Sequence, residues 1–306
     1  MSRPGRNLLA AATAAATAAI VTATAFSPAL AAARKPAARP AARTTTGICT
    51  SAKHAALAAR ISNRVTAELA QRPNSAVGIA VDDKTLGLTC SLHANKHFIA
   101  ASVIKVTIIS ALLLKEGGQS HLTADQRILA REMITESDDD AATDLWDEVG
   151  MPGMQAFLNK ARMRHTVLNV AWGLTELTAH DEMTLLHVLT TSNKVLSRNS
   201  RNYVLRLMAD VVPSQRWGVS AGAPSDVTVH IKNGWLPYPD SNLSSSDWHI
   251  NSIGAFTGTN IGYQIVVLTA PSSASDPQQT EGYGITTIED AAGVVNRQIA
   301  KVQATG

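Results

Sequence analysis

A serine and a lysine three positions apart, Ser102 and Lys105, form the pair in this sequence best suited to chemistry. They precede the apolar run 106–114, so we expect both at the start of a buried helix, with their side chains on one face. A helix N-terminus favours a developing oxyanion, and apolar surroundings lower the pKa of a lysine, so that its neutral amine can accept a proton. The pair is therefore a candidate activated nucleophile.

The spacing of this pair is weak evidence by itself. Composition alone would produce about one Ser-x-x-Lys match in a chain of 306 residues, and Ser102/Lys105 is the only match here. The alternative interpretation is a helix that Ser102 caps, with Lys105 extending its amine along the surface to water.

The surrounding pattern predicts how the pair is held. A three-layer α/β/α sandwich is expected, with an antiparallel five-stranded sheet and an inserted all-helical subdomain at about 118–224. The expected strands are 76–81, 86–93, 227–236, 248–256 and 261–269, and the expected terminal helices are 51–71 and 286–302. Within the middle region, helices are expected to break near Glu136, Pro152, 164–172 and Asn193.

The first residues are expected to lie outside this domain. Residues 1–33 are typical of a secretory signal peptide, with cleavage near Ala31 or Ala33; a membrane anchor is the alternative. Residues 34–47 are rich in Pro, Ala and Arg and predict a disordered linker ahead of a domain at 48–306. We therefore expect a secreted protein without a stable membrane anchor.

The charge of the chain is concentrated in that leader. The formal net charge is +3, and residues 1–47 hold six basic residues and no acidic one, so the rest carries about −3. Nothing in the domain predicts a nucleic-acid surface. The basic linker could adhere to anionic wall polymers, or serve only as a solvated spacer.

Cys49 and Cys90 are the only cysteines. An even count behind an export signal favours one disulfide, joining the start of the first helix to a strand edge, and two free buried thiols are the alternative. Neither cysteine has a convincing neighbouring base, so neither is expected to be catalytic.

Two further motifs follow Ser102 in the chain. Glu136-Ser137-Asp138-Asp139 is expected between two helices, and Ile231-Lys232-Asn233-Gly234-Trp235 on a strand. With Ser-x-x-Lys, these resemble the three motifs of the serine β-lactamase and penicillin-binding-protein superfamily, and the order of elements is most similar to the class A β-lactamase fold. The resemblance extends from about Cys49 to Val302.

The resemblance implies a role for each motif residue. Ser102 would be the acylated nucleophile, Lys105 its proton acceptor or relay, and Ser137 the group that passes a proton to the leaving nitrogen. Lys232 would hold the Ser137 hydroxyl and supply positive charge for a substrate carboxylate. The backbone N–H groups of Ser102 and Trp235 would form the oxyanion hole, and Gly234 would let substrate lie against the strand.

Departures from the family pattern are equally informative. Asp139 replaces the usual Asn, where its carboxylate would favour charged Lys105 unless it is protonated or turned away. Asn233 replaces the Thr or Ser that usually binds a substrate carboxylate, and Asn233 and Asp139 are the candidate substrate-binding residues at these two positions. Trp235 is bulky where small residues are common. The short spacing from Ser102 to Ser137 indicates that a segment walling the cleft is missing.

The loop 164–177 lacks the family's usual base. Class A enzymes carry there a glutamate that activates the deacylating water, ahead of a Leu-Asn pair. Here Leu168-Asn169 has no acid before it, and Glu176 is the loop's only carboxylate. Glu176 is either that base or, more plainly, a charge in the first turn of the next helix; His165 and His180 are the other substitutes.

The leading hypothesis is a secreted active-site-serine hydrolase, acylated on Ser102 by a lactam, amide or ester. A D-alanyl-peptidase or esterase-type cell-wall enzyme with slow lactam deacylation is the second hypothesis, and a non-catalytic cell-wall peptide-binding protein the third. A glycosidase would need two opposed carboxylates, which the superfamily motif explains better. No metal or organic cofactor is implied, the partner would be a small β-lactam, ester or wall peptide, and we expect a monomer.

Overall fold

The structure is a computed structural model that describes residues 47–237, 248–272 and 280–303. These residues belong to one compact unit of the chain, Thr45–Gly306. The expected signal peptide at 1–33 and nearly all of the expected linker at 34–47 lie outside the described residues, so both stay predictions. Among the described residues, no helix has both the length and the apolar character needed to cross a bilayer.

The core of the unit is an antiparallel sheet with the strand order β1-β3-β2-β8-β7-β6. Its strands are β1 (Cys49–Ser51), β2 (Ser75–Asp83), β3 (Leu88–Leu92), β6 (Thr228–Pro237), β7 (Trp248–Gly258) and β8 (Ile261–Ser272). The fold class predicted from the sequence is confirmed, but the sheet has one strand more than the five expected.

The additional strand, β1, precedes the first helix, whose start was predicted too early in the chain. Residues 49–51 pair with β3, and α1 (Ala55–Ala70) begins four positions later than expected. The Ser51 hydroxyl accepts a hydrogen bond from the His54 N–H at 2.9 Å and donates to the Leu86 carbonyl at 2.8 Å, so it turns the chain before the helix starts. The predicted Cys49–Cys90 disulfide is present, but it joins strand β1 to β3 rather than a helix to a strand.

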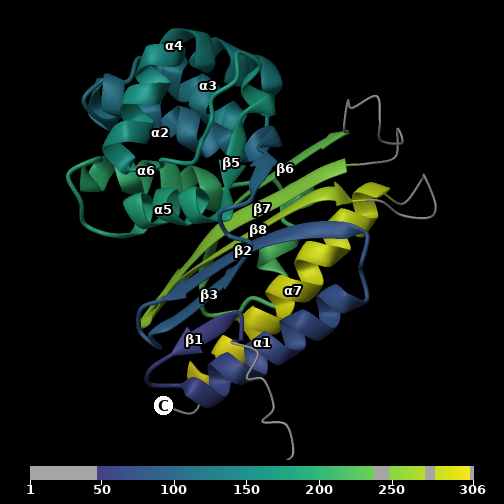
Figure 1. The fold of residues 1–306 in the computed structure, drawn as a ribbon. Coiled ribbons are helices and arrows are strands. Elements are labelled where there is room, and N and C mark those ends of the chain that lie inside the picture. Colours follow the sequence, from purple (N-terminus) through teal and green to yellow (C-terminus); the bar gives the residue numbers. More distant parts are fainter. Residues whose placement is uncertain (1–46, 238–247, 273–279, 304–306) are drawn as a thin grey trace, which may run out of the picture. The chain divides into compact units, whose positions relative to one another are not determined.

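Helices cover both faces of the sheet (Figure 1). The long helix α7 (Thr280–Gln303) packs with α1 on one face, and the helices of the middle region lie on the other. Strand β8 shows why two layers form. Ile265 and Val267 join the apolar cluster under α1 and α7, whereas Val266 and Leu268 join the cluster under the middle helices, because successive side chains of a strand point to opposite faces.

The middle region, 118–224, is largely helical. It contains α3 (Ala124–Thr135), α4 (Asp139–Ala161), α5 (Ala179–Thr190) and α6 (Arg198–Ala209), with one short strand, β5 (Glu176–Thr178), before α5. Helix α2 (Lys105–Lys115) precedes this region in the chain and packs against it. Residues 105–113 of α2 are buried on every side of the helix, because α3, α4 and α6 pack around it. In α4 the break lies at Gly150, whose φ of 68° departs from the helix two residues before Pro152.

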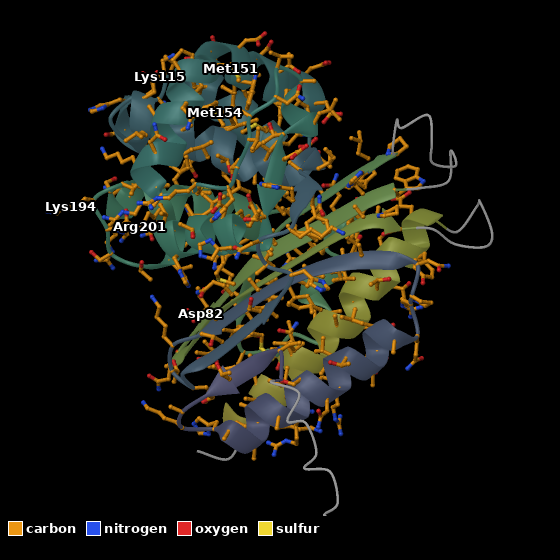
Figure 2. All side chains as sticks on the ribbon, viewed as in Figure 1. Asp82, Lys115, Met151, Met154, Lys194 and Arg201 are labelled. Carbon is orange, nitrogen blue, oxygen red and sulfur yellow. A yellow bond between two sulfur atoms is a disulfide. The ribbon has the colours of Figure 1, made fainter. Side chains whose placement is uncertain are left out.

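Figure 2 shows how these layers are filled. Met154 is fully buried within the helical region, whereas Lys115 lies exposed at its outer side. Asp82 on β2 is joined to α5 through a 2.9 Å hydrogen bond to His187 Nε2. A separate pair of short strands, β4 (His97–Ile99) and β5 (Glu176–Thr178), ties the segment before Ser102 to the end of the loop that precedes α5.

Candidate active site

Ser102 lies in a tight turn that leads into a buried helix. Residues Ala101–Ile104 form a 3₁₀ turn continuous with α2, which confirms the predicted location at a helix start. Ala101 has a φ of 49°, a conformation that L-residues rarely adopt. The buried Asn251 of β7 holds this backbone in place, because its amide nitrogen donates to the carbonyls of Ile99 at 2.8 Å and Ala100 at 3.0 Å.

Strand β6 lies directly against the turn at Ser102, at Gly234. A Cβ at this position would be 2.7 Å from the Ser102 backbone nitrogen, 2.9 Å from that of Val103 and 3.1 Å from the Ala100 carbonyl oxygen. These are backbone atoms that cannot swing aside as a flexible side chain would. Glycine is therefore required because the strand and the turn touch, a reason different from the predicted role of Gly234 in receiving substrate, which stays a prediction.

Lys105 is completely buried, and its ammonium group has three acceptors. Nζ donates to the Ser137 carbonyl at 2.7 Å, to the Ser137 hydroxyl at 3.2 Å and to Asp139 Oδ1 at 2.5 Å. Burial lowers the pKa of Lys105, and the hydrogen bond and charge of Asp139 oppose that shift. The amine is thus poised between a neutral base and a paired cation.

Ser137 joins the two lysines of the site. Its hydroxyl accepts from Lys105 Nζ at 3.2 Å and from Lys232 Nζ at 2.9 Å, so its own hydrogen remains available to donate. The residue adopts a φ of 62° in the turn between α3 and α4, just before Asp138 caps α4. The three motifs, far apart in the sequence, therefore meet at one hydroxyl group.

Lys232 is the second buried amine. It is 0% exposed on β6, and Nζ also donates to the Asn233 carbonyl at 3.0 Å. Burial, and then the charge of Lys105, hold the pKa of Lys232 well below its usual value, with Asp139 acting in the opposite direction. Two amines that share Ser137 disfavour one another's charged forms.

A cavity of about 300 Å³ opens beside Ser102. Asp139 is its only acidic lining residue among the described residues, and the rest of the wall is small, apolar or aromatic: Ala101, Ala171, Trp172, Gly173, Leu174, Trp235 and Leu236. A larger hollow of about 880 Å³ beside α1 and the β2–β3 hairpin contains none of the motif residues. The cavity at Ser102 can therefore hold a small carbonyl compound beside the serine.

Comparison with known proteins agrees with this arrangement. A family model described as "Beta-lactamase enzyme family" matches residues 116–287, more than half of the chain, including the Ser137 and Lys232 motifs. The chain belongs to the beta-lactamase enzyme family. The family match confirms the superfamily and the enzyme class, a serine hydrolase of the beta-lactamase type.

Solved structures of the family share the fold at low sequence identity. The structure of PBP-A has a TM-score of 0.64 and 18% identity, covering 79% of this chain and 96% of its own. A class A beta-lactamase from Bacteroides cellulosilyticus has a TM-score of 0.65 and 16% identity, covering 79% and 98%. A beta-lactamase from Streptosporangium roseum has a TM-score of 0.63 and 18% identity, covering 79% and 99%. The curated proteins contain no match in sequence.

Against this family background, the expected substrate contact of Asn233 is wrong. The side chain is 1% exposed, and its amide nitrogen donates to the backbone carbonyls of Gln215 at 2.8 Å and Trp217 at 3.0 Å. It faces away from Lys232, because neighbouring residues of a strand point to opposite sides. Asn233 fastens a neighbouring loop instead of receiving a carboxylate. Trp235, two residues further along β6, does line the cavity, as expected.

Asp139 is oriented toward the site rather than turned away from it. Its carboxylate is bonded to Lys105 although 74% of the side chain is exposed. It is the first residue of α4, after Asp138, whose side chain accepts the Ala141 N–H at 2.7 Å. The helix start therefore directs the carboxylate at the lysine.

Glu176 does not occupy the position of a water-activating base. It is exposed on β5, pairs with Ile99, and is absent from the lining of the Ser102 cavity. Its plainer predicted role is also wrong, because α5 begins at Ala179 after the Thr178 cap, and its first-turn acids are Asp181 and Glu182. His165 and His180, the other substitutes, face Asp181 and do not line the cavity either.

Trp172 is the residue of the loop that reaches Lys105. The Lys105 Nζ lies 4.9 Å from the centroid of its ring, and the indole N–H donates to the Thr143 hydroxyl at 3.2 Å. The sequence motifs did not indicate Trp172 or Asn251. For Trp172 the available signal was an aromatic residue in the loop that usually carries the base. For Asn251 the sequence offered no signal.

Proposed function

We propose that this chain hydrolyses a small lactam, amide or ester through a covalent ester on Ser102. One observation supports the proposal above the others: the Ser137 hydroxyl lies within hydrogen-bond distance of both buried lysines, beside a cavity that Ser102 lines. A purely structural serine and lysine at a helix start would not need a second buried amine.

In the acylation step, neutral Lys105 takes the Ser102 proton, directly or through a water. The Ser102 oxygen then bonds to the carbonyl carbon. The bond from that carbon to the leaving nitrogen or oxygen breaks as Ser137 delivers a proton to the leaving atom, and Ser137 is reprotonated from a lysine. The backbone N–H groups of Ser102 and Trp235 would stabilise the oxyanion, and each such donor is typically worth about 3 kcal/mol.

The loop favours slow release of the acyl group. Trp172 lies over Lys105 where a carboxylate would be needed to activate water, and Asp139 is engaged by Lys105. This arrangement supports the second candidate, a D-alanyl-peptidase or esterase-type cell-wall enzyme. Lactams would acylate such an enzyme, and the acyl group would then be released slowly. The apolar, partly aromatic cavity is compatible with both substrate classes.

Incubation with a fluorescent penicillin and a chromogenic cephalosporin tests the proposal, with Ser102→Ala as the control variant. Label bound to Ser102 at one equivalent supports acylation, and sustained cephalosporin turnover supports a true lactamase. Labelling without turnover supports the peptidase or esterase candidate. If neither lactams nor small esters react in a Ser102-dependent way, the third hypothesis, a non-catalytic wall-peptide-binding protein, replaces both.

We further propose that the mature enzyme is exported as a monomer. The leader composition supports export. N-terminal sequencing of protein from the culture medium should begin just after Ala31 or Ala33, and light scattering should give the mass of one chain. An uncleaved N-terminus retained in the membrane fraction would contradict export.

A further inference from the structure

A second group of polar side chains lies where the two ends of the loop that carries Trp172 come together. His165 stands at the start of this loop, and His180 and Asp181 lie in the first turn of α5, where the loop ends. The Asp181 side chain is completely buried, whereas the two imidazoles are about half exposed, at 45% and 56%. One nitrogen of each histidine and one Asp181 oxygen lie within 4.8 Å of one another.

Asp181 is held rigidly by only one of its two oxygens. Oδ2 accepts the His165 backbone N–H at 2.7 Å and the Thr166 hydroxyl at 2.9 Å. Oδ1 faces both rings, at 3.3 Å from His165 Nδ1 and 3.5 Å from His180 Nδ1. The rings are nearly perpendicular, at 86°, with centroids 5.6 Å apart.

Hydrogen bonding accounts poorly for these two contacts. A histidinium–carboxylate bond is typically about 2.7–2.9 Å long, and both separations exceed that range. They correspond instead to the edge of a coordination tetrahedron. Zinc bonds of about 2.0–2.1 Å to nitrogen and oxygen place neighbouring ligand atoms about 3.3–3.4 Å apart.

We propose that His165 Nδ1, His180 Nδ1 and Asp181 Oδ1 bind one divalent transition-metal ion of the Zn²⁺ type. Two imidazoles and one carboxylate are the donors such an ion prefers, and water would complete the fourth position. The two hydrogen bonds to Oδ2 orient the carboxylate, as partners of metal ligands commonly do. The half-exposed rings leave a path for the ion from solvent.

The bound ion would join the start of the loop, at His165, to its end, at α5. The loop already closes through the backbone pair Val167–Glu176, and His97 Nε2 contacts the His165 carbonyl at 2.7 Å. A metal bridge from His165 to α5 adds a link on the same side. Because Trp172 lies within the closed segment, the bound ion would restrict the ring that lies over Lys105.

Metal binding can be measured without any substrate, so its failure is distinguishable from failure of the proposed hydrolase function. Untagged protein is treated with EDTA, dialysed and titrated with Zn²⁺ by calorimetry at neutral pH, and then with Co²⁺ while its visible absorption is recorded. We expect one equivalent and Co²⁺ bands of tetrahedral intensity. At a hundredfold excess over Kd, Zn²⁺ should raise Tm by about 5–10 °C.

The variants His165→Ala and His180→Ala should each weaken binding at least tenfold. His121→Ala is the matched control, because His121 is another exposed histidine, remote in sequence, that contacts the Glu116 carbonyl. Circular dichroism establishes that each variant is folded, and His165→Asn and His180→Asn replace any that is not. Absence of stoichiometric binding, wild-type affinity in either folded histidine variant, or equal loss in His121→Ala would overturn the proposal.

Discussion

The ammonium group of Lys105 is bonded to the carboxylate of Asp139 at 2.5 Å, although one side chain is fully buried and the other 74% exposed. This contact opposes the lowering of the Lys105 pKa by burial. A base must be neutral to accept a proton, so Asp139 restrains the residue proposed to activate Ser102. The reactivity of the site should depend on pH through this one pair.

The variant Asp139→Asn should react faster at neutral pH. Without the carboxylate, the pKa of Lys105 falls further, so more of the amine is neutral. We expect the rise of the acylation rate with pH to move to lower pH, because the carboxylate that favours charged Lys105 is gone. Penicillin labelling rates across pH measure this shift. Asp140→Asn, an exposed neighbour in the same helical turn, should leave the profile unchanged, and an identical profile in Asp139→Asn would contradict the coupling.

Lys105→Ala should abolish acylation. Loss of a positioned general base typically costs about 10²–10⁴-fold in rate. The measurement is the second-order rate of penicillin labelling, with thermal melting to show that the variant is folded. Lys115→Ala, at the exposed far end of the same helix, is the control and should label normally. Normal labelling of Lys105→Ala would remove the assignment of the base.

Gly234→Ala should separate β6 from the nucleophile. The added methyl group would be 2.7 Å from the Ser102 nitrogen, so the turn or the strand must shift. We expect acylation to fall about 10²-fold, with a loss of about 1–3 kcal/mol in the free energy of unfolding. Gly262→Ala on β8 has open space around its Cβ and should change neither quantity. A fully active Gly234→Ala would show that the oxyanion site does not depend on this contact.

Trp172→Glu should accelerate release of the acyl group. The indole ring lies beside Lys105 and lines the cavity, so a carboxylate there could activate water. We expect cephalosporin turnover at least tenfold above wild type at a similar acylation rate, measured by burst and steady-state kinetics. In the control Trp172→Gln, the new side chain has the size of glutamate without its charge, so this variant should not show the gain. Equal gains in both variants would mean that the gain comes from removing the indole ring and not from the added carboxylate.

Protonation of His249 should destabilise the fold in mild acid. Its side chain is 4% exposed, and burial lowers its pKa to about 4 from the ordinary 6.5. Between these values the unfolded chain binds a proton that the folded chain does not. This histidine's contribution to the free energy of unfolding therefore falls by about 1.4 kcal/mol per pH unit as pH decreases from 6.5 to 4. Urea unfolding across this range should show a smaller slope in His249→Gln than in wild type or His121→Gln. Equal slopes in all three would contradict it.

Local sequence determined the elements and the order of the motifs. The apolar run after Lys105 specifies a buried helix, and the unbroken apolar run 265–268 in β8 specifies a strand covered on both faces. These features depend on neighbours a few positions apart, so they can be predicted without the fold. The same reasoning misplaced the start of α1, since the turn at Ser51 depends on the distant Leu86 carbonyl.

The details that decide reactivity depend on contacts between distant segments. Trp172 reaches Lys105 across 67 positions and Asn251 reaches the turn at Ser102 across about 150, and no local pattern encodes either contact. The sequence alone proposed Ser102, Lys105, Ser137 and Lys232 as the candidate site residues. Only the tertiary structure decided that Asp139 turns inward, that Asn233 turns away and that Glu176 lies outside the cavity. The physical reason is that a side chain's direction follows from how its strand or helix end packs against the rest of the molecule, which its neighbours in sequence do not specify.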